Sequence, residues 1–221
     1  KKYNQQIEID WIVDEAYKDL LNNHPDINKV YSIQLKKAKQ NKSFFLLFKE
    51  LNKVRKFGFY DLVIDMQGLI KSALISHLIK SPVTLGFDKS STREGVASFF
   101  YNQTFKYDYS KNIIERNIAL IAFSLGLGDS KLEIKNKTSF LYSRQNYIIE
   151  SLSKTKKNII LIPGASHKSK CYPLENLAKL TTLIDANFII IWGDTNEKEM
   201  AKKIKTHGSN VIICEKLSID S

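Results

Sequence analysis

The sequence has few of the residues that form metal centres, disulfide scaffolds or membrane spans. Its 221 residues include only two cysteines, Cys171 and Cys214, whose spacing matches no metal-ligand motif. No apolar run approaches the ~20 residues that a transmembrane helix needs. Two lone thiols are typical of a reducing cytosol. The four histidines also lack the i, i+4 spacing of a metal site: His24, His77, His167 and His207.

Common catalytic signatures are missing as well. There is no Walker A spacing of glycines before a Lys-Ser or Lys-Thr pair, and no Ser/His/Asp or Cys/His set can be recognised. Acidic residues are relatively few: the chain has 23 acids and 34 lysines and arginines, which gives a net charge of +11. This excess favours an anionic partner, such as nucleic acid, a membrane surface or a phosphorylated or carboxylated substrate. A solvated lysine-rich surface would explain it equally well.

What is present is an alternation of strand and helix patterns, which predicts an α/β fold with parallel sheets. Short apolar runs bounded by turn residues predict strands at residues 7–13, 30–33, 62–65, 84–86, 158–162, 187–192 and 210–214. Amphipathic periodicity predicts helices at residues 14–23, 43–57, 69–79, 93–101, 112–125, 174–184 and 196–206. Ser43 is the expected N-cap of the second of these helices, and Gly126 with Gly128 should end the fifth.

A polar segment at residues 131–155, with one short helix near residues 144–152, separates two such α/β units. We therefore expect a first domain at residues 1–145 and a second at residues 146–221. The first begins on a strand without a preceding glycine turn, and the second holds only three strands. Both domains are expected to be incomplete at the outer ends of the chain.

Polar residues gather around the strand ends of the segment Tyr60–Asn102, where open α/β sheets bind ligands. They are Asp65, Gln67, Lys71, Arg93 and Glu94. The planar guanidinium of Arg93 suits a carboxylate or a phosphate, although it could equally pair with a neighbouring acid. A run of lysines follows the 30–33 strand at Lys36, Lys37, Lys39 and Lys42. It is interpreted either as a cationic loop for anions or as a solvated charge run.

Two loops of the second domain are further candidates. Pro163–Lys170 follows a strand with small and hydroxyl residues and ends in a lysine, which suits a phosphate or an ordinary polar loop. Trp192–Glu197 also follows a strand, and Glu197 could accept the two hydroxyls of a ribose. The same residues could instead cap the next helix through Asp194 or Thr195.

Several motifs together resemble the bacterial lipopolysaccharide heptosyltransferases of glycosyltransferase family 9. They are IDWIVDE at residues 9–15, YDLVIDMQGLIKSAL at 60–74, TREGVASFFYN at 92–102, the loop Pro163–Pro173, and WGDTNE at 192–197. The resemblance runs from residue 7 to the end of the chain.

The resemblance implies a GT-B fold of two Rossmann-like domains facing each other across a cleft. It implies inverting, metal-independent transfer of L-glycero-D-manno-heptose from ADP-heptose to Kdo of Kdo2-lipid A. Carried over by position, Ser166, Lys170 and Glu197 look like donor-binding residues. The matching acceptor-side residues are Lys36, Lys37, Lys39, Gln67, Lys71 and Arg93.

The resemblance also sets expectations about what the chain lacks and where it acts. The general base of the family would precede Lys1, a donor-diphosphate segment would follow Ser221, and the chain alone should be inactive. Cys171 stands where the family more often has His, and Ala165 where Thr is common. The implied location is the cytoplasmic face of the inner membrane of a Gram-negative bacterium, as a peripheral protein without nucleic acid.

Two alternatives stay open at this point. One is another GT-B sugar-nucleotide transferase of the same family, which Gln67, Lys71 and Arg93 would distinguish. The other is a basic nucleic-acid-binding module, which needs stacking aromatics on an exposed sheet or a recognition helix. Phe99, Phe100 and Tyr101 are consecutive on a predicted helix, so their side chains diverge and suit a core better than a stacking platform.

Overall fold

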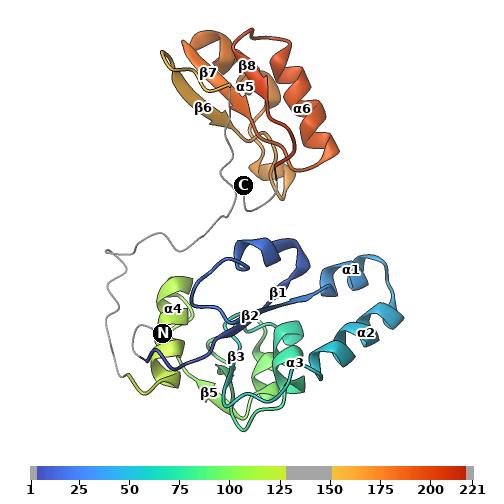
Figure 1. Cartoon of the computed structure of the whole chain (residues 1–221), viewed down its shortest axis with the longest axis vertical. Helices are drawn as coiled ribbons and strands as arrows, with labels where there is room; N and C mark the ends of the chain where they lie inside the picture. The colour runs from blue at the N-terminus through green and yellow to red at the C-terminus, as the bar shows by residue number, and fades with distance from the viewer. Residues whose placement is uncertain (1–3, 128–150, 218–221) are drawn as a thin grey trace. The chain divides into compact units, whose positions relative to one another are not determined.

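The computed structural model describes residues 4–127 and 151–217. By contacts the chain divides into two compact units. The N-terminal unit comprises Trp11–Glu15 and Tyr31–Ser139, and the C-terminal unit comprises Phe140–Ser221 together with Lys1–Asp10 and Ala16–Val30. Figure 1 shows the elements of each unit along the colour gradient. The predicted domain boundary at residues 145/146 lies outside the described residues, as does the predicted helix near 144–152 apart from its last two residues, which are not helical.

Short strands at the start of the chain form two small sheets. β1 (Asp10–Asp14) and β2 (Lys29–Ile33) make a two-stranded sheet, with the 3₁₀ helix η1 (Glu15–Leu20) between them in the sequence. β3 (Val63–Ile64), β4 (Thr84–Phe87) and β5 (Gln103–Phe105) make a second, parallel sheet in that order. The predicted parallel α/β arrangement is therefore confirmed. β4 is buried along its whole length, as expected for the central strand of a parallel sheet.

The helices of the N-terminal unit include those predicted at residues 43–57, 69–79 and 112–125, with bounds that differ by up to three residues. They are α1 (Leu35–Gln40), α2 (Phe44–Val54), α3 (Ile70–Leu78), the 3₁₀ helix η2 (Gly95–Phe100) and α4 (Ile113–Ser124). The Ser43 hydroxyl accepts a hydrogen bond from the backbone of Leu46 at 3.2 Å, as an N-cap should. Gly126, with a φ of +65°, ends α4, and the Leu127 amide closes the turn on the Ala122 carbonyl at 2.9 Å.

Three predictions for residues 14–101 are wrong in detail. Lys36, Lys37 and Lys39 do not lie in a loop, since residues 35–40 form α1, and only Lys42 follows this helix in a turn. Ala38 is buried, Leu35 packs on the core beside it, and lysine and alanine are good helix formers. The predicted helices at 14–23 and 93–101 are short 3₁₀ helices, η1 and η2. The strand β5 was missed because it is only three residues long.

The C-terminal unit contains a second parallel sheet, in the order β6 (Lys157–Leu161), β7 (Ala186–Ile190) and β8 (Val211–Ile213). Its helices are η4 (Lys168–Lys170), α5 (Leu174–Leu183) and α6 (Thr195–Lys205). Every residue of the central strand β7 is buried. Phe188, Ile190 and Ile204 belong to the core of this unit, whose strands and helices are labelled in Figure 1. The strand–helix alternation predicted for residues 157–214 is thus confirmed.

Candidate functional site

A buried carboxylate organises the strand end of β3. Asp65, which is 4% exposed, accepts hydrogen bonds from the Gln67 amide at 2.8 Å and the Ser72 hydroxyl at 2.7 Å. The Tyr101 hydroxyl also donates to Oδ2 of Asp65, the oxygen that binds Ser72, at 2.7 Å. Burial raises the pKa of the Tyr101 phenol, and the neighbouring Asp65 raises it further. A buried charge with several donors is stable, so Asp65 is positioned as a structural anchor.

The loop that carries Arg93 is fastened to this strand end by its neighbours on both sides. The Thr92 hydroxyl donates to the Gly68 carbonyl, and the Glu94 carboxylate accepts from the Ile70 amide at 2.7 Å. Ile70 is the first residue of α3, whose free amides favour a negative charge. Gly68 has a φ of +63°, and a Cβ there would lie 2.3 Å from the Thr92 hydroxyl. Only glycine fits this close approach.

These contacts bring together the predicted acceptor-side residues of the segment Tyr60–Asn102. Gln67, Lys71 and Arg93 are all exposed, and they surround the first turn of α3. Their side chains have no hydrogen bond or ion pair within the described parts of the chain. Glu94, the nearest acid in sequence to Arg93, is engaged by the backbone of Ile70 instead. The cations therefore stay available to an anionic ligand.

The lysine run is only partly described. Lys37 is exposed on α1, whereas the side chains of Lys36 and Lys39 lie outside the described part of the chain.

Arg116, which the sequence analysis did not predict, also holds the loop that carries Arg93. It is buried on α4 and donates to the Ser91 carbonyl, while its guanidinium lies over the rings of Phe87 at 4.9 Å and Tyr109 at 4.5 Å. Ser91 in turn accepts from the Tyr107 amide at 2.8 Å. An arginine among the apolar residues of an amphipathic helix was the signal that could have indicated this role.

Two loops of the C-terminal unit meet at Glu197. Its Oε2 accepts from the Gly193 amide at 2.6 Å, and its own amide donates to the Asp194 side chain at 2.8 Å. Asp194 is the N-cap of α6, so the predicted capping arrangement is present. A Cβ on Gly164 would lie only 1.8 Å from Oε1 of Glu197. The loop after β6 therefore closes directly on this carboxylate.

Ser166 and Lys170 lie in the loop after β6, and both are exposed. Lys170 is the last residue of η4, which its own backbone bond to the His167 carbonyl closes at 2.9 Å. Its ammonium has no ion-pair or hydrogen-bond partner among residues 4–127 and 151–217. The geometry therefore presents an acid fixed by a backbone amide, Glu197 in the first turn of α6, and an unpaired cation, Lys170 in the loop after β6.

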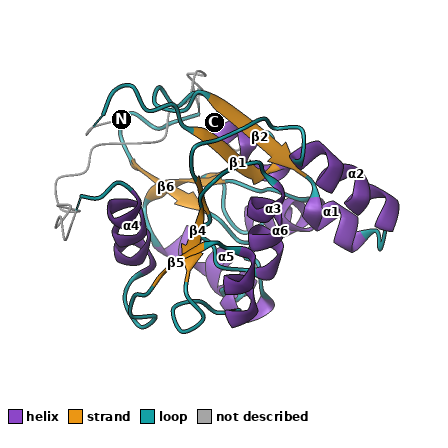
Figure 2. Cartoon of the chain, turned by 90° about the horizontal axis from the view of Figure 1, so that it is seen from below, coloured by secondary structure: helices purple, strands orange, loops and turns teal. Residues whose placement is uncertain are grey.

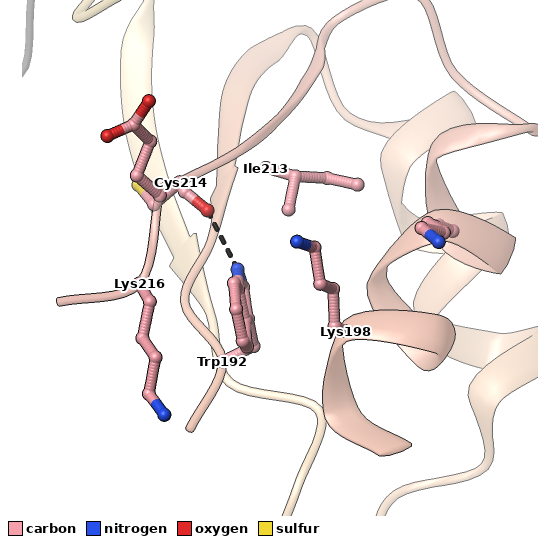
Figure 3. A pocket seen from close by; sticks show the side chains of 7 residues that line it. Trp192, Lys198, Ile213, Cys214 and Lys216 are labelled. Atoms are coloured by element: carbon pink, nitrogen blue, oxygen red, sulfur yellow. Dashed lines mark hydrogen bonds between the residues drawn. The ribbon is translucent and has the colours of Figure 1, made fainter. Parts of the chain in front are cut away.

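An open pocket of about 600 Å³ lies at the ends of β7 and β8. The Trp192 indole donates to the Cys214 carbonyl at 2.7 Å, and the Lys198 ammonium lies 4.6 Å from the centre of the indole ring. Figure 3 shows Ile213 facing Lys198 across this pocket, with Lys216 near its rim. Burial raises the pKa of the Cys214 thiol. The sequence analysis did not predict this pocket, because its lining comes from three separate segments.

Neither a metal-binding cluster nor a membrane-spanning helix is found among the described residues. No group of three or more histidine, cysteine or acidic residues in the described parts could hold a metal ion. Within those same parts, no helix has both the length and the apolar character required to cross a membrane.

The chain matches the model of the family described as glycosyltransferase family 9 (heptosyltransferase) over residues 45–221. It is 36% identical to lipopolysaccharide heptosyltransferase 1 of Campylobacter coli, over all of this chain and 67% of that protein. The enzyme of the same name from Escherichia coli is 26% identical over 97% of this chain and 67% of its own length. The chain thus spans about two thirds of these relatives.

Solved structures show the same fold. Escherichia coli heptosyltransferase WaaC with ADP matches with a TM-score of 0.74 and 25% identity, covering 99% of this chain and 67% of that chain. Escherichia coli ADP-heptose lps heptosyltransferase II matches with a TM-score of 0.64 and 18% identity over 99% and 67% of the two chains. The expected fold class is therefore confirmed.

Proposed function

The chain belongs to glycosyltransferase family 9, and from this we propose that it is part of an inverting heptosyltransferase of lipopolysaccharide inner-core synthesis. The donor is ADP-heptose and the acceptor is a Kdo sugar of Kdo2-lipid A. The observation that carries the proposal is the 36% identity to a heptosyltransferase 1 over the whole chain. The motifs by which this chain resembles the family include both the loop of Arg93 and the loop of Lys170.

The donor side of the proposal uses the C-terminal unit. Lys170 supplies positive charge to the diphosphate as it leaves, and its lack of a protein partner within the described residues supports this role. Glu197 holds the ribose, because Gly193 fixes one carboxylate oxygen at 2.6 Å and leaves the other available as an acceptor. Ser166, exposed in the same loop, donates its hydroxyl to the phosphates.

The acceptor side uses the N-terminal unit. Arg93, Lys71 and Gln67 surround the first turn of α3 and hold the carboxylates of Kdo, with Arg93 as the planar, two-pronged donor. Lys36, Lys37 and Lys39 on α1 add positive charge for the phosphates of lipid A.

The reaction is a displacement at the anomeric carbon. The acceptor hydroxyl forms the new glycosidic bond, the bond to the diphosphate breaks with inversion, and the hydroxyl proton passes to a base. No residue of this chain is assigned as that base. We include metal independence in the proposal, since Lys170 provides the charge that a metal would otherwise supply. Heptose transfer that persists in EDTA would support metal independence, and loss of transfer in EDTA would contradict it.

The proposed location is the cytoplasmic face of the inner membrane of a Gram-negative bacterium, where the protein is peripheral. The net charge of +11 supports this, because that face carries anionic lipids.

The test is a transfer assay with the full-length protein. Release of ADP and addition of one heptose to Kdo2-lipid A are expected when both substrates are present. Transfer only to an acceptor that already carries heptose would instead assign the chain to another transferase of the family. Absence of transfer to either acceptor would overturn the proposal.

Replacing Arg93 by Ala separates the two sides of the site. The KM for the acceptor should rise about tenfold, the scale of a lost hydrogen bond to a charged group. The affinity for ADP, measured by calorimetry, should not change. A fall in ADP affinity would show that the acceptor side is assigned to the wrong unit.

A further inference from the structure

Helix α2 begins with phenylalanines that face solvent. Phe44 is 87% exposed, Phe45 81% and Phe48 62%. Phe44 and Phe48 are one helical turn apart and share a face, and Phe45 lies beside them. Large aromatic side chains gathered on one helix end in this way are uncommon on a soluble surface and indicate an interaction site. We call these three residues the Phe patch.

Helix α2 buries its acid and exposes its phenylalanines, which is unusual for a surface helix. Its acid, Glu50, is buried at 6% exposure and accepts a hydrogen bond from the Gln34 amide at 3.1 Å. Val54, one turn further on, is also buried. The carboxylate therefore faces the protein, where it fixes α2 to the start of α1, while the phenylalanines face outward.

The surroundings of the Phe patch are strongly basic. Residues 35–59 contain eight lysines and arginines and one acid, and that acid is the buried Glu50. Lys37, Lys42 and Lys49 are exposed on α1, on the turn before Ser43 and on α2 itself. Figures 1 and 2 both show α1 and α2 at the outer edge of their unit. The surface thus combines exposed aromatic rings with positive charge and presents no exposed acid.

We propose that the Phe patch and its lysines dock the protein on an anionic lipid surface, an inference that rests on the proposed membrane-bound acceptor. Aromatic rings enter the boundary between headgroups and acyl chains, and lysines extend to the lipid phosphates. Charge complementarity selects this occupant, because an anionic bilayer offers both an apolar layer and a negative surface. The docking would hold α1 and its lysines close to the headgroup of a lipid acceptor.

The experiment measures binding of the full-length protein to vesicles that contain phosphatidylglycerol. Phe44→Ser, Phe45→Ser and Phe48→Ser together should lower the partition coefficient at least tenfold, since burying one such ring alone contributes about that factor. The matched control is Phe99→Ser on η2, which is 77% exposed but lies outside the Phe patch, and it should bind like the parent protein. Binding should weaken with salt and be poor on phosphatidylcholine.

A second variant keeps the test valid if the triple substitution disturbs folding. Phe45→Trp retains the aromatic character, and its emission should shift to the blue when phosphatidylglycerol vesicles are added, whereas Phe99→Trp should not respond. Emission that is already blue-shifted without vesicles would mean that another protein segment covers the Phe patch. A triple variant that changes only the oligomeric state would mean that a second copy covers it. Either result would overturn the inference.

Transfer to acceptor dispersed in detergent distinguishes this proposal from the proposed function. Loss of vesicle binding with intact transfer in detergent supports the docking surface. A parent protein that transfers heptose but ignores anionic vesicles would overturn the docking surface and leave the proposed function in place.

Discussion

The candidate sites of the two units differ in what the protein holds and what it leaves free. At the end of β3, Asp65 is buried and accepts from both hydroxyl and backbone donors. At the end of β6, Lys170 is exposed on a loop and has no partner among the described residues. The Asp65 carboxylate is thus satisfied by protein donors, whereas the Lys170 ammonium has no protein partner among the described residues.

The two sites nevertheless share one rule. The carboxylates Glu94 and Glu197 are each fixed by a backbone amide, of Ile70 and Gly193 respectively. The exposed cations Arg93 and Lys170 are left without an acid to pair with in the described parts of the chain. In both units, therefore, an acid is held by the backbone while a cation stays exposed, an arrangement that suits the proposed anionic substrates.

The largest effect should come from removing the free cation of the C-terminal unit. Lys170→Ala should lower the transfer rate about 10²–10³-fold, the scale of losing one group that stabilises developing charge. The control is Lys168→Ala, an exposed lysine of the same short helix η4, which should change the rate little. Steady-state kinetics of the full-length protein measure both. Equal losses in the two variants would show that the loop needs charge in general and not Lys170 in particular.

The second largest effect should be a loss of folding stability that is confined to the N-terminal unit. Asp65→Ala leaves the buried Tyr101 hydroxyl and the Gln67 amide of the turn without the acceptor that they use, which should cost about 3 kcal/mol. Asp61→Ala, an exposed acid nearby, should cost less than about 0.5 kcal/mol. Hydrogen exchange should show faster exchange in α3 peptides and unchanged exchange in β7 peptides. Faster exchange in β7 as well would contradict the independence of the two sites.

A smaller effect tests whether Glu197 is as firmly held as Asp65. In Gly164→Ala the new Cβ would lie 1.8 Å from Oε1 of Glu197, so the carboxylate must rotate away. The affinity for ADP should fall about tenfold with little change in stability. Gly193→Ala is the milder control, since its Cβ would lie 3.3 Å from Oε2. Calorimetry with ADP ranks the two, and the reverse order would contradict the role of Glu197.

The sequence was sufficient where structure depends on neighbours along the chain. Ser43 as a cap, Gly126 as a helix end and the order of strands and helices all follow from local patterns. It was insufficient where partners are distant, as with Tyr101, which lies 36 residues from the carboxylate it binds. It placed Gln67, Lys71 and Arg93 at strand ends, but which acids would be occupied by backbone amides depends on tertiary packing. The exposure of the Phe patch has the same origin, because whether another element covers an apolar helix face depends on tertiary packing.

The smallest effect removes one partner of Asp65 and keeps the others. Tyr101→Phe should lower the free energy of unfolding by about 1 kcal/mol at neutral pH, the net contribution of one hydrogen bond. The Tyr101→Phe substitution should also change how the free energy of unfolding depends on pH. The pKa of Tyr101 is raised in the folded protein, so above about pH 10 the unfolded chain loses this proton first and stability falls.

The free energy of unfolding of the N-terminal unit, measured in urea between about pH 9 and pH 11, should therefore fall less steeply with pH in Tyr101→Phe than in the parent protein. Parallel curves would mean that the phenol is not held against a buried carboxylate. The contrast between a satisfied charge at β3 and a free charge at β6 would then disappear, because Asp65 would be as open to solvent and ligand as Lys170.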